Sequence, residues 1–178
     1  LLFDAFVDRA NPTDNKHVLL EPDDTTDAYF VRAVNLDPQS GAVTWDSSTA
    51  RGTFTLPVSA AALHSSGCIV TVHTDSGRVG VLQPAATTPP GVAAYRAGQG
   101  AQTGLLQSPT AVAVTNPGVA LILDTGAAQL AAFDLNGNPV QYFGADPNNL
   151  QYTQPLATPG LYLDIAVDGA SHIFLLYM

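Results

Sequence analysis

The residues that could do chemistry are few, and the best placed of them follow apolar runs. His73 and Asp75 stand in the segment VHTDSG, which ends the run 69–72. Asp124 ends the run 119–123 in the same way, roughly fifty residues later. Imidazole and carboxylate groups are metal ligands and acid–base groups. We therefore expect His73, Asp75 and Asp124 to be the candidate contacts at a rim or channel mouth.

A simpler interpretation explains the same residues, because aspartates often cap turns and histidines are often exposed in them. The sequence shows no paired His or Cys at ligand spacing, no G-x-S-x-G elbow and no dinucleotide fingerprint. It therefore assigns no catalytic, cofactor-binding or metal-ligating residue, and we expect no cofactor and no stoichiometric transition metal. Cys68 is the single cysteine and is predicted to be a small buried core residue.

Composition limits the partners. The formal net charge is −9, which disfavours nucleic acid and anionic membrane surfaces, since both need clustered Lys and Arg. No apolar run reaches the roughly 18 residues of a membrane span, so a soluble chain with no membrane insertion is expected. Alanine is frequent and Lys16 is the only lysine, which is typical of GC-rich bacterial genes. We expect an extracellular setting or a surface, phage-tail or injection assembly.

The stretch 108–144 alternates short apolar runs with turn residues. Asn116-Pro117-Gly118, Asp124-Thr125-Gly126 and Asn136-Gly137 separate the runs, and Asn-Gly is a strong hairpin signal. Four strands of an antiparallel meander are predicted, at 111–114, 119–123, 129–133 and 140–143.

The same order of elements recurs at intervals of roughly fifty residues. Residues 54–83 repeat it with strands at 60–63 and 69–72, and 158–178 repeat its first half with strands at 165–167 and 173–176. In the N-terminal part, VRAVNLDPQSGAVTWD is predicted to be two strands around a DPQSG turn. Repeated four-stranded modules are typical of a β-propeller. The prediction is a single all-β propeller region, 1–178, with approximate blades 1–50, 54–95, 108–144 and 158–178; a β-sandwich is the alternative.

The module at 108–144 resembles an NHL repeat. The features that carry the resemblance are Pro109, Asp124-Thr125-Gly126, Phe133-Asp134, Asn136-Gly137 and Phe143-Gly144. The usual Asn and Arg after Asp-Thr-Gly are replaced by Ala127 and Ala128. The resemblance implies a propeller and indicates little about function.

Strand interiors should form the core. The residues predicted to be buried are Val70, Val72, Leu121, Leu123, Phe133, Ile165, Ala166, Phe174 and Leu176. The last module has only two predicted strands, and three and a half blades are fewer than the four to eight that usually close a ring. We therefore expect an incomplete part of a larger propeller, completed by a longer chain or a partner subunit.

Two classes of function fit this sequence. The first is a non-catalytic binding or structural module that contacts a protein or glycan partner through loops on a rigid scaffold. The second is a metal-assisted propeller enzyme, similar to a lactonase or lyase. Such an enzyme should place several carboxylates or histidines at matching inner positions, and only His73 and Asp124 do so, with alanines nearby. The binding module is therefore preferred.

Overall fold

The computed structural model describes residues 3–7, 16–22, 29–36, 39–40, 42–45, 52–83, 91–157 and 161–178. These residues form β-strands, turns and one short 3₁₀ turn, η1 (Thr74–Ser76), with no α-helix among them. Accordingly, none of the described residues belongs to a helix that could cross a membrane. The predicted all-β class is confirmed.

The first sheet contains the N-terminal strands. Its path is β1 (Phe3–Val7), β2 (Lys16–Pro22), β3 (Tyr29–Leu36), β5 (Gly52–Phe54) and β9 (Gly91–Val92), and β4 (Val43–Trp45) also pairs with β3. All neighbours are antiparallel except β5 and β9. The two strands predicted around the DPQSG turn are confirmed as β3 and β4.

Two complete four-stranded antiparallel sheets follow. The second sheet consists of β6 (Ala60–Leu63), β7 (Ile69–His73), β8 (Arg78–Leu82) and β10 (Ala94–Ala97). The third consists of β11 (Pro109–Val114), β12 (Val119–Asp124), β13 (Gln129–Asp134) and β14 (Thr153–Pro155). In both sheets the first strand lies at one edge and the last at the other. A final hairpin is formed by β15 (Tyr162–Val167) and β16 (Ile173–Tyr177).

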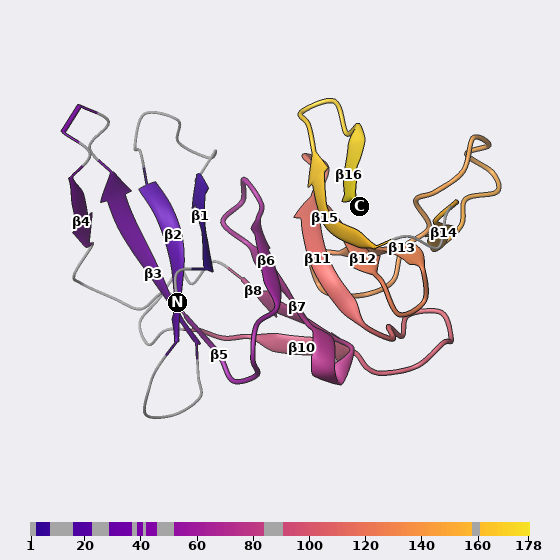
Figure 1. Cartoon of the computed structure of the whole chain (residues 1–178), viewed down its shortest axis with the longest axis horizontal. Helices are drawn as coiled ribbons and strands as arrows, with labels where there is room; N and C mark the ends of the chain where they lie inside the picture. Colours follow the sequence, from indigo (N-terminus) through magenta and orange to yellow (C-terminus); the bar gives the residue numbers. More distant parts are fainter. Residues whose placement is uncertain are drawn as a thin grey trace.

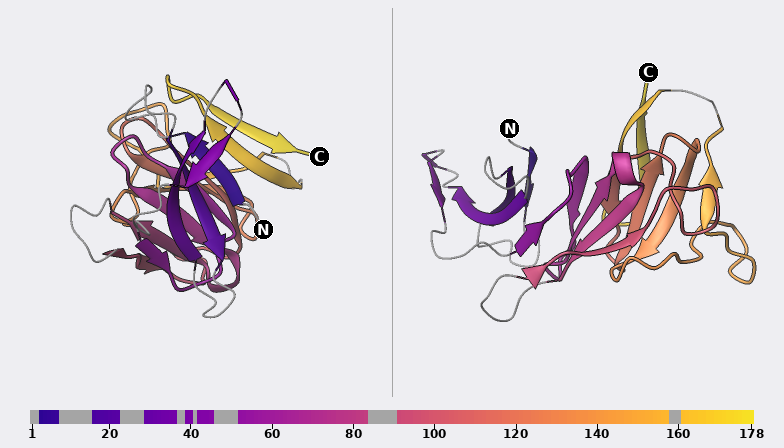
Figure 2. Two further views of the ribbon diagram at one scale, coloured as in Figure 1. Left: turned by 90° about the vertical axis from the view of Figure 1, so that its left-hand side faces the viewer. Right: turned by 90° about the horizontal axis from the view of Figure 1, so that it is seen from below.

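The sheets stack so that the first strand of each sheet contacts the first strand of the next. β6 contacts β11, β11 contacts β15, and β1 contacts β6. Figure 1 shows β1, β6, β11 and β15 toward the middle of the molecule, and the right-hand view of Figure 2 shows the first three sheets following one another in sequence order. A sandwich would pair two sheets face to face, whereas here each successive sheet packs on the one before it. The arrangement is that of consecutive propeller blades, which confirms the predicted fold as an incomplete propeller.

Apolar side chains on both faces of the third sheet fill the core. Val112, Ala120 and Ile122 pack against Val70 and Val72 of the second sheet. The alternate residues of the third sheet, among them Ala111, Leu121 and Leu123, pack against Ile165 of the hairpin. The period of two along each strand therefore divides its side chains between the two neighbouring blades.

The prediction of a fourth strand at 140–143 is wrong. The strand that completes the third sheet is β14, where Leu130 lies opposite Gln154. Phe143 makes only an isolated bridge, to Gln151, and its side chain is buried. The apolar residues of 140–143 therefore reflect burial in the core and not pairing with a neighbouring strand.

Most of the predicted core is confirmed, because Val70, Val72, Leu121, Leu123, Phe133 and Ile165 are all buried. The prediction is wrong for Ala166, Phe174 and Leu176. All three are exposed, Phe174 at 56% and Leu176 at 59%. These residues lie on the face of the final hairpin that no described sheet covers. Cys68 is buried as predicted, and burial raises the pKa of its thiol to about 11.

Candidate functional site

His73 ends β7 and is only 2% exposed. Its Nδ1 lies 2.7 Å from the Pro57 carbonyl oxygen and its Nε2 lies 2.9 Å from the Thr71 hydroxyl. A carbonyl can only accept, so Nδ1 carries the proton, and in the neutral ring Nε2 accepts from Thr71. Burial lowers the pKa of His73; the hydrogen bond to Pro57 opposes this shift and Arg78 adds to it. The geometry is that of a neutral histidine held inside its blade.

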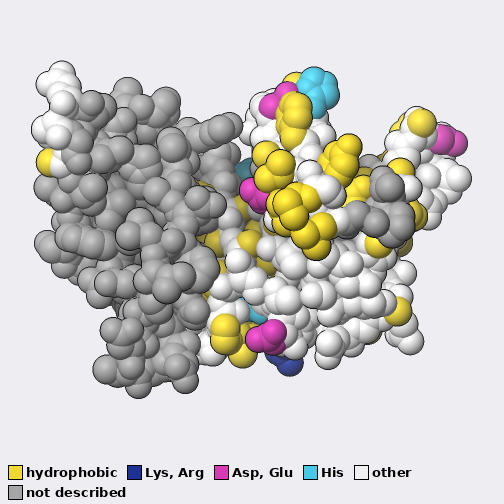
Figure 3. Space-filling model, in the orientation of Figure 1, with side chains coloured by type: hydrophobic (Ala, Val, Ile, Leu, Met, Phe, Trp, Pro, Cys, Tyr) yellow, Lys and Arg dark blue, Asp and Glu magenta, His cyan; other side chains and the backbone are white. Residues whose placement is uncertain are grey.

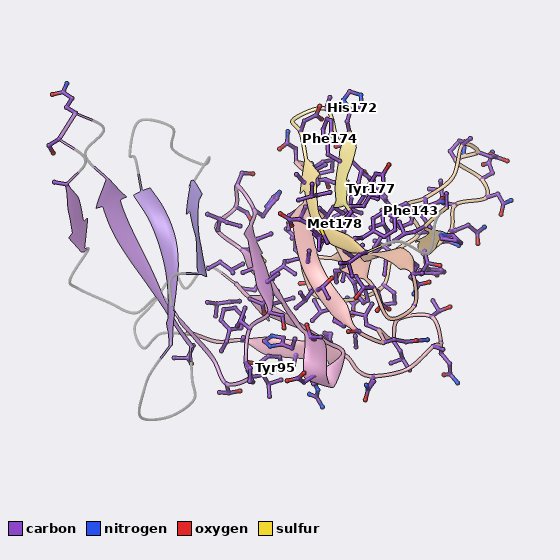
Figure 4. The ribbon with its side chains drawn as sticks, viewed as in Figure 1. Tyr95, Phe143, His172, Phe174, Tyr177 and Met178 are labelled. Atoms are coloured by element: carbon purple, nitrogen blue, oxygen red, sulfur yellow. The ribbon has the colours of Figure 1, made fainter. Side chains whose placement is uncertain are left out.

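Aromatic packing and a glycine complete the His73 environment. The ring of Tyr95 meets His73 edge-on at a centroid distance of 5.2 Å. A Cβ at Gly80 would lie 2.7 Å from the His73 Nε2, so the glycine leaves room for the imidazole. Figure 4 shows Tyr95 on the lower side of the molecule, far from the labelled His172.

Asp124 holds the same place in the next blade, at the end of β12, and is 0% exposed. Its carboxylate accepts hydrogen bonds from the backbone N–H of Gln107 at 3.0 Å and of Ser108 at 2.7 Å. Thr125, the next residue, donates both its N–H and its hydroxyl to the Ser108 carbonyl. The Asp124 carboxylate therefore holds Gln107 and Ser108, which precede β11, in place through hydrogen bonds.

His73 and Asp124 thus have equivalent roles, but one donates its hydrogen bond to the preceding segment and the other accepts. His73 donates to a carbonyl of the segment before β6, and Asp124 accepts from N–H groups of the segment before β11. Asp75 lies in η1 and is exposed. Among the described residues, no group of three or more His, Cys, Asp or Glu side chains could hold a metal ion. The structure places His73 and Asp124 at the last positions of second strands and Asp75 in the turn that follows β7. The first two make hydrogen bonds within their own blades.

A second set of turns was predicted from the sequence as hairpin turns, but the contacts between them were not. The turns that join the first two strands of successive sheets, here called the turn row, are His64–Gly67, Thr115–Gly118 and Asp168–Ser171. In each, the N–H of the fourth residue donates to the carbonyl of the first, and the first residue's N–H donates to the carbonyl of the fifth. The fourth residue has positive φ in all three, including the non-glycine Ser171 at 66°. These three turns therefore share one backbone hydrogen-bond pattern with different side chains, and Asp134–Gly137, outside the row, has the same pattern.

Hydrogen bonds join the turn row across blades. The His64 Nε2 lies 3.0 Å from the Asn116 carbonyl oxygen, and the Asn116 side-chain amide donates to the Gly169 carbonyl at 2.9 Å. Because Nε2 faces a carbonyl, it carries the proton, which leaves Nδ1 to accept from Ser66. The sequence predicted turns at Asn116-Pro117-Gly118 and Asp168-Gly169 and matched Gly67 to Gly118, but it gave no signal for the hydrogen bonds between these turns.

The last turn of the row holds an exposed Asp–His pair. The Asp168 carboxylate lies 2.7 Å from the His172 Nδ1 and also accepts from the N–H groups of Ala170 and His172. Its hydrogen bonds with His172 lower the pKa of Asp168, and the hydrogen bond from Ala170 adds to this effect. The His172 side chain is 72% exposed, and Figure 4 shows it at the tip of the β15–β16 hairpin.

No protein-family model matches this sequence, and no curated protein matches it. Solved structures do resemble it. A proposed 6-phosphogluconolactonase from Bacteroides fragilis gives a TM-score of 0.57 at 16% identity, over 93% of this chain and 48% of that one. Streptogramin B lyase gives 0.51 at 10%, over 98% and 61%. Kluyveromyces lactis Hsv2 gives 0.51 at 11%, over 99% and 64%.

These similar structures are β-propellers, so the comparison agrees with the stacking seen here. Identities this low show the fold alone. The NHL-repeat resemblance of 108–144 remains a prediction about the repeat type. This chain spans about half to two thirds of the length of the three structures.

Proposed function

We propose that the chain is a non-catalytic β-propeller scaffold whose turn row binds a protein partner. The observation that carries this proposal is the row itself: three turns share one backbone geometry, differ in side chains and are hydrogen-bonded to each other. A rigid backbone that presents variable side chains loses little entropy on binding. Loops held on a rigid scaffold are also where propellers and similar folds carry function.

The use of His73 and Asp124 supports a binding function over a catalytic one. A ligand-binding or acid–base group must present a free atom to the substrate. Both nitrogens of His73 and both oxygens of Asp124 are instead engaged within their own blades. An enzyme site on the propeller axis would need free atoms on His73 and Asp124, but these atoms are already used in hydrogen bonds that stabilise the fold.

The composition of the row favours a protein over a glycan. Large aromatic side chains are the residues best suited to stack on a flat apolar surface, and none of the described turn-row residues is Phe, Tyr or Trp. The row instead presents small side chains, with Ser65, Asn116 and Ala170 exposed. Short polar contacts of this kind suit the edge and rim of a protein interface.

The test uses the purified chain against a displayed peptide library and a glycan array. Ser65→Arg and Ala170→Arg change two exposed positions of the row that make no described side-chain hydrogen bond. We expect this double variant to weaken peptide binding at least about tenfold, the effect of removing roughly 1.4 kcal/mol. Ala145→Arg, in an exposed turn outside the row, is the matched control and should bind as the parent does.

Three outcomes would overturn the proposal. Binding that both variants retain would show that the row is not the binding surface. Row-dependent binding to glycans alone would change the class of partner. Stoichiometric zinc in the purified protein, together with lactone hydrolysis that His73→Phe abolishes, would favour the metal-assisted enzyme instead.

A further inference from the structure

The backbone N–H groups in the second half of each turn of the row are already used or missing. The N–H of the fourth residue donates to the carbonyl of the first in all three turns. At the third position, the Ser66 N–H donates to the His64 Nδ1 at 3.2 Å. The Ala170 N–H donates in the same way to the Asp168 carboxylate at 2.8 Å. Pro117, the third residue of the middle turn, has no N–H, so these positions offer a partner no backbone donor.

The polar side-chain atoms at the two ends of the row are acceptors when both histidines are neutral. At one end, the His172 Nδ1 donates to the Asp168 carboxylate at 2.7 Å, so the Nε2 carries a lone pair. This Nε2 makes no described hydrogen bond, and the His172 side chain is 72% exposed. At the other end, the Ser66 hydroxyl donates to the His64 Nδ1 at 2.8 Å. Only the lone pairs of the Ser66 oxygen are then left for a partner.

The charge of the row favours a partner that carries Lys or Arg. Asp168 is the only Asp, Glu, Lys or Arg residue in the three turns. Figure 3 shows histidine and acidic side chains together at the tip of the β15–β16 hairpin. The chain as a whole has a formal net charge of −9, and a field of this sign steers positively charged groups toward the surface.

The surroundings of the row add one carboxylate and one guanidinium among the described residues. Leu135, in the turn Asp134–Gly137, lies beside Gly118 of the row, because a Cβ at Gly118 would lie 3.0 Å from the Leu135 Cδ1. This contact brings the Asp134 carboxylate close to the row. The side-chain stem of Arg96 packs on the same turn. Neither charged group forms a described ion pair with either histidine of the row, so Asp168 is the charged group that faces them most directly.

Protonation of the two histidines reverses this pattern of acceptors. Histidine changes its charge between about pH 5 and 8. When His172 is protonated, its Nε2 becomes an N–H donor while its Nδ1 stays with Asp168. When His64 is protonated, its Nδ1 donates to the Ser66 hydroxyl, which turns its own O–H outward. Both ends of the row thus change from acceptors to donors, and each gains a positive charge.

We propose that the turn row binds a Lys- or Arg-rich segment of its protein partner at neutral pH and releases it when His64 and His172 become protonated. This inference rests on the function proposed above, and it adds the chemistry of the partner and the regulation of binding. Lysine and arginine side chains only donate hydrogen bonds. They therefore match the acceptors and the Asp168 carboxylate of the neutral row, and they are repelled by the protonated one.

The test selects peptides from the displayed library at pH 7.5 and measures their Kd at pH 7.5 and 5.5 at constant ionic strength. Lys and Arg should be enriched in the selected peptides, and the Kd should be at least about tenfold higher at pH 5.5. In the double variant His64→Gln and His172→Gln, the Kd should differ by less than about threefold between the two pH values. His172→Gln alone replaces an exposed ring and should lose part of the pH dependence.

His17→Gln, in β2, is the matched control and should keep the pH dependence of the parent. Circular dichroism at both pH values checks that the parent and each variant are folded. A selected peptide counts as bound to the row when Ser65→Arg with Ala170→Arg weakens it and Ala145→Arg does not. This comparison separates contact with the row from a general effect of added positive charge.

The outcomes distinguish this inference from the function on which it rests. If no peptide binds to the row at either pH, the proposed function is wrong and this inference fails with it. Peptides that bind to the row without enrichment of Lys or Arg, or with equal Kd at the two pH values, would overturn this inference alone. A pH dependence that the double histidine variant retains would assign the effect to other groups and would also overturn it.

Discussion

Replacing His73 with Phe tests whether this histidine is a structural residue. Phenylalanine keeps a ring in the space against Tyr95 but removes both hydrogen bonds of the imidazole. The Pro57 carbonyl loses its partner, whereas the Thr71 hydroxyl can still reach the Gly80 carbonyl at 3.4 Å. An unsatisfied buried acceptor costs about 1–3 kcal/mol. We expect His73→Phe to lower the free energy of unfolding by that amount at pH 8.

The pH dependence gives a sharper result than the magnitude. Burial lowers the pKa of His73 in the folded protein below the ordinary 6.5. Between those two pKa values the unfolded chain binds one more proton than the folded chain does. The contribution of a neutral His73 is therefore fully present above pH 6.5 and is lost as the pH falls toward the folded pKa, by about 1.4 kcal/mol per pH unit.

Urea unfolding followed by circular dichroism at pH 8, 7, 6 and 5.5 measures this dependence. The parent should lose stability below pH 6.5 more steeply than His73→Phe, so the two should converge as the pH falls. His172→Phe changes an exposed ring outside the His73 environment and serves as the control variant. Parallel curves for the parent and His73→Phe would refute the assignment of His73 as a buried neutral residue.

Three further predictions concern other parts of the fold. Asp124→Ala leaves two N–H groups unpaired and should lower the free energy of urea unfolding by about 1–3 kcal/mol for each. The control Asp146→Ala, in an exposed turn, should lower it by less than about 1 kcal/mol. Similar losses for the two variants would contradict the structural role of the buried Asp124 carboxylate. Ser171→Gly relieves a positive φ of 66° and should raise the free energy of unfolding by about 0.5–1 kcal/mol, and an unchanged midpoint would count against this turn geometry. Cys68 is buried with a pKa of about 11, so a thiol reagent at pH 8 should label it only after urea unfolding, and rapid labelling of the folded protein would show that its environment is open.

The strands of the central blades could be predicted because local signals agree there. The apolar runs at 60–63, 111–114 and 119–123 are bounded by Gly, Pro and Asn, and turn chemistry and period point to the same elements. The run 140–143 is also largely apolar, but it forms an isolated bridge in place of a strand, and Phe143 is buried in the core. Periodicity alone cannot separate these two cases, because partner strands are not a local property.

Burial at the final hairpin could not be predicted for a related reason. Alternation assigns Phe174 and Ile165 to opposite faces, but it does not say whether a neighbouring sheet covers each face. The structure shows a covered face at Ile165 and an uncovered one at Phe174.

The sequence indicated where His73 and Asp124 lie along the chain but not what they contact. Each residue ends the second strand of its sheet. Whether such a side chain points to solvent or back to its own blade depends on the lead-in segments at Pro57 and Gln107, many residues away. The contacts of the turn row, such as His64 with Asn116, join different blades and likewise leave no local signal.

The central claim is that the polar groups at the blade ends hold the scaffold instead of acting on a substrate. Nitrogen-15 NMR of the histidine rings, recorded across pH 5 to 8 with and without zinc, tests it most directly. We expect His73 to be in the Nδ1–H tautomer, to titrate below the pKa of an exposed histidine and not to respond to zinc. A His73 ring that titrates normally, or whose signals shift or broaden with one equivalent of zinc, would show that the ring is free to act on a ligand.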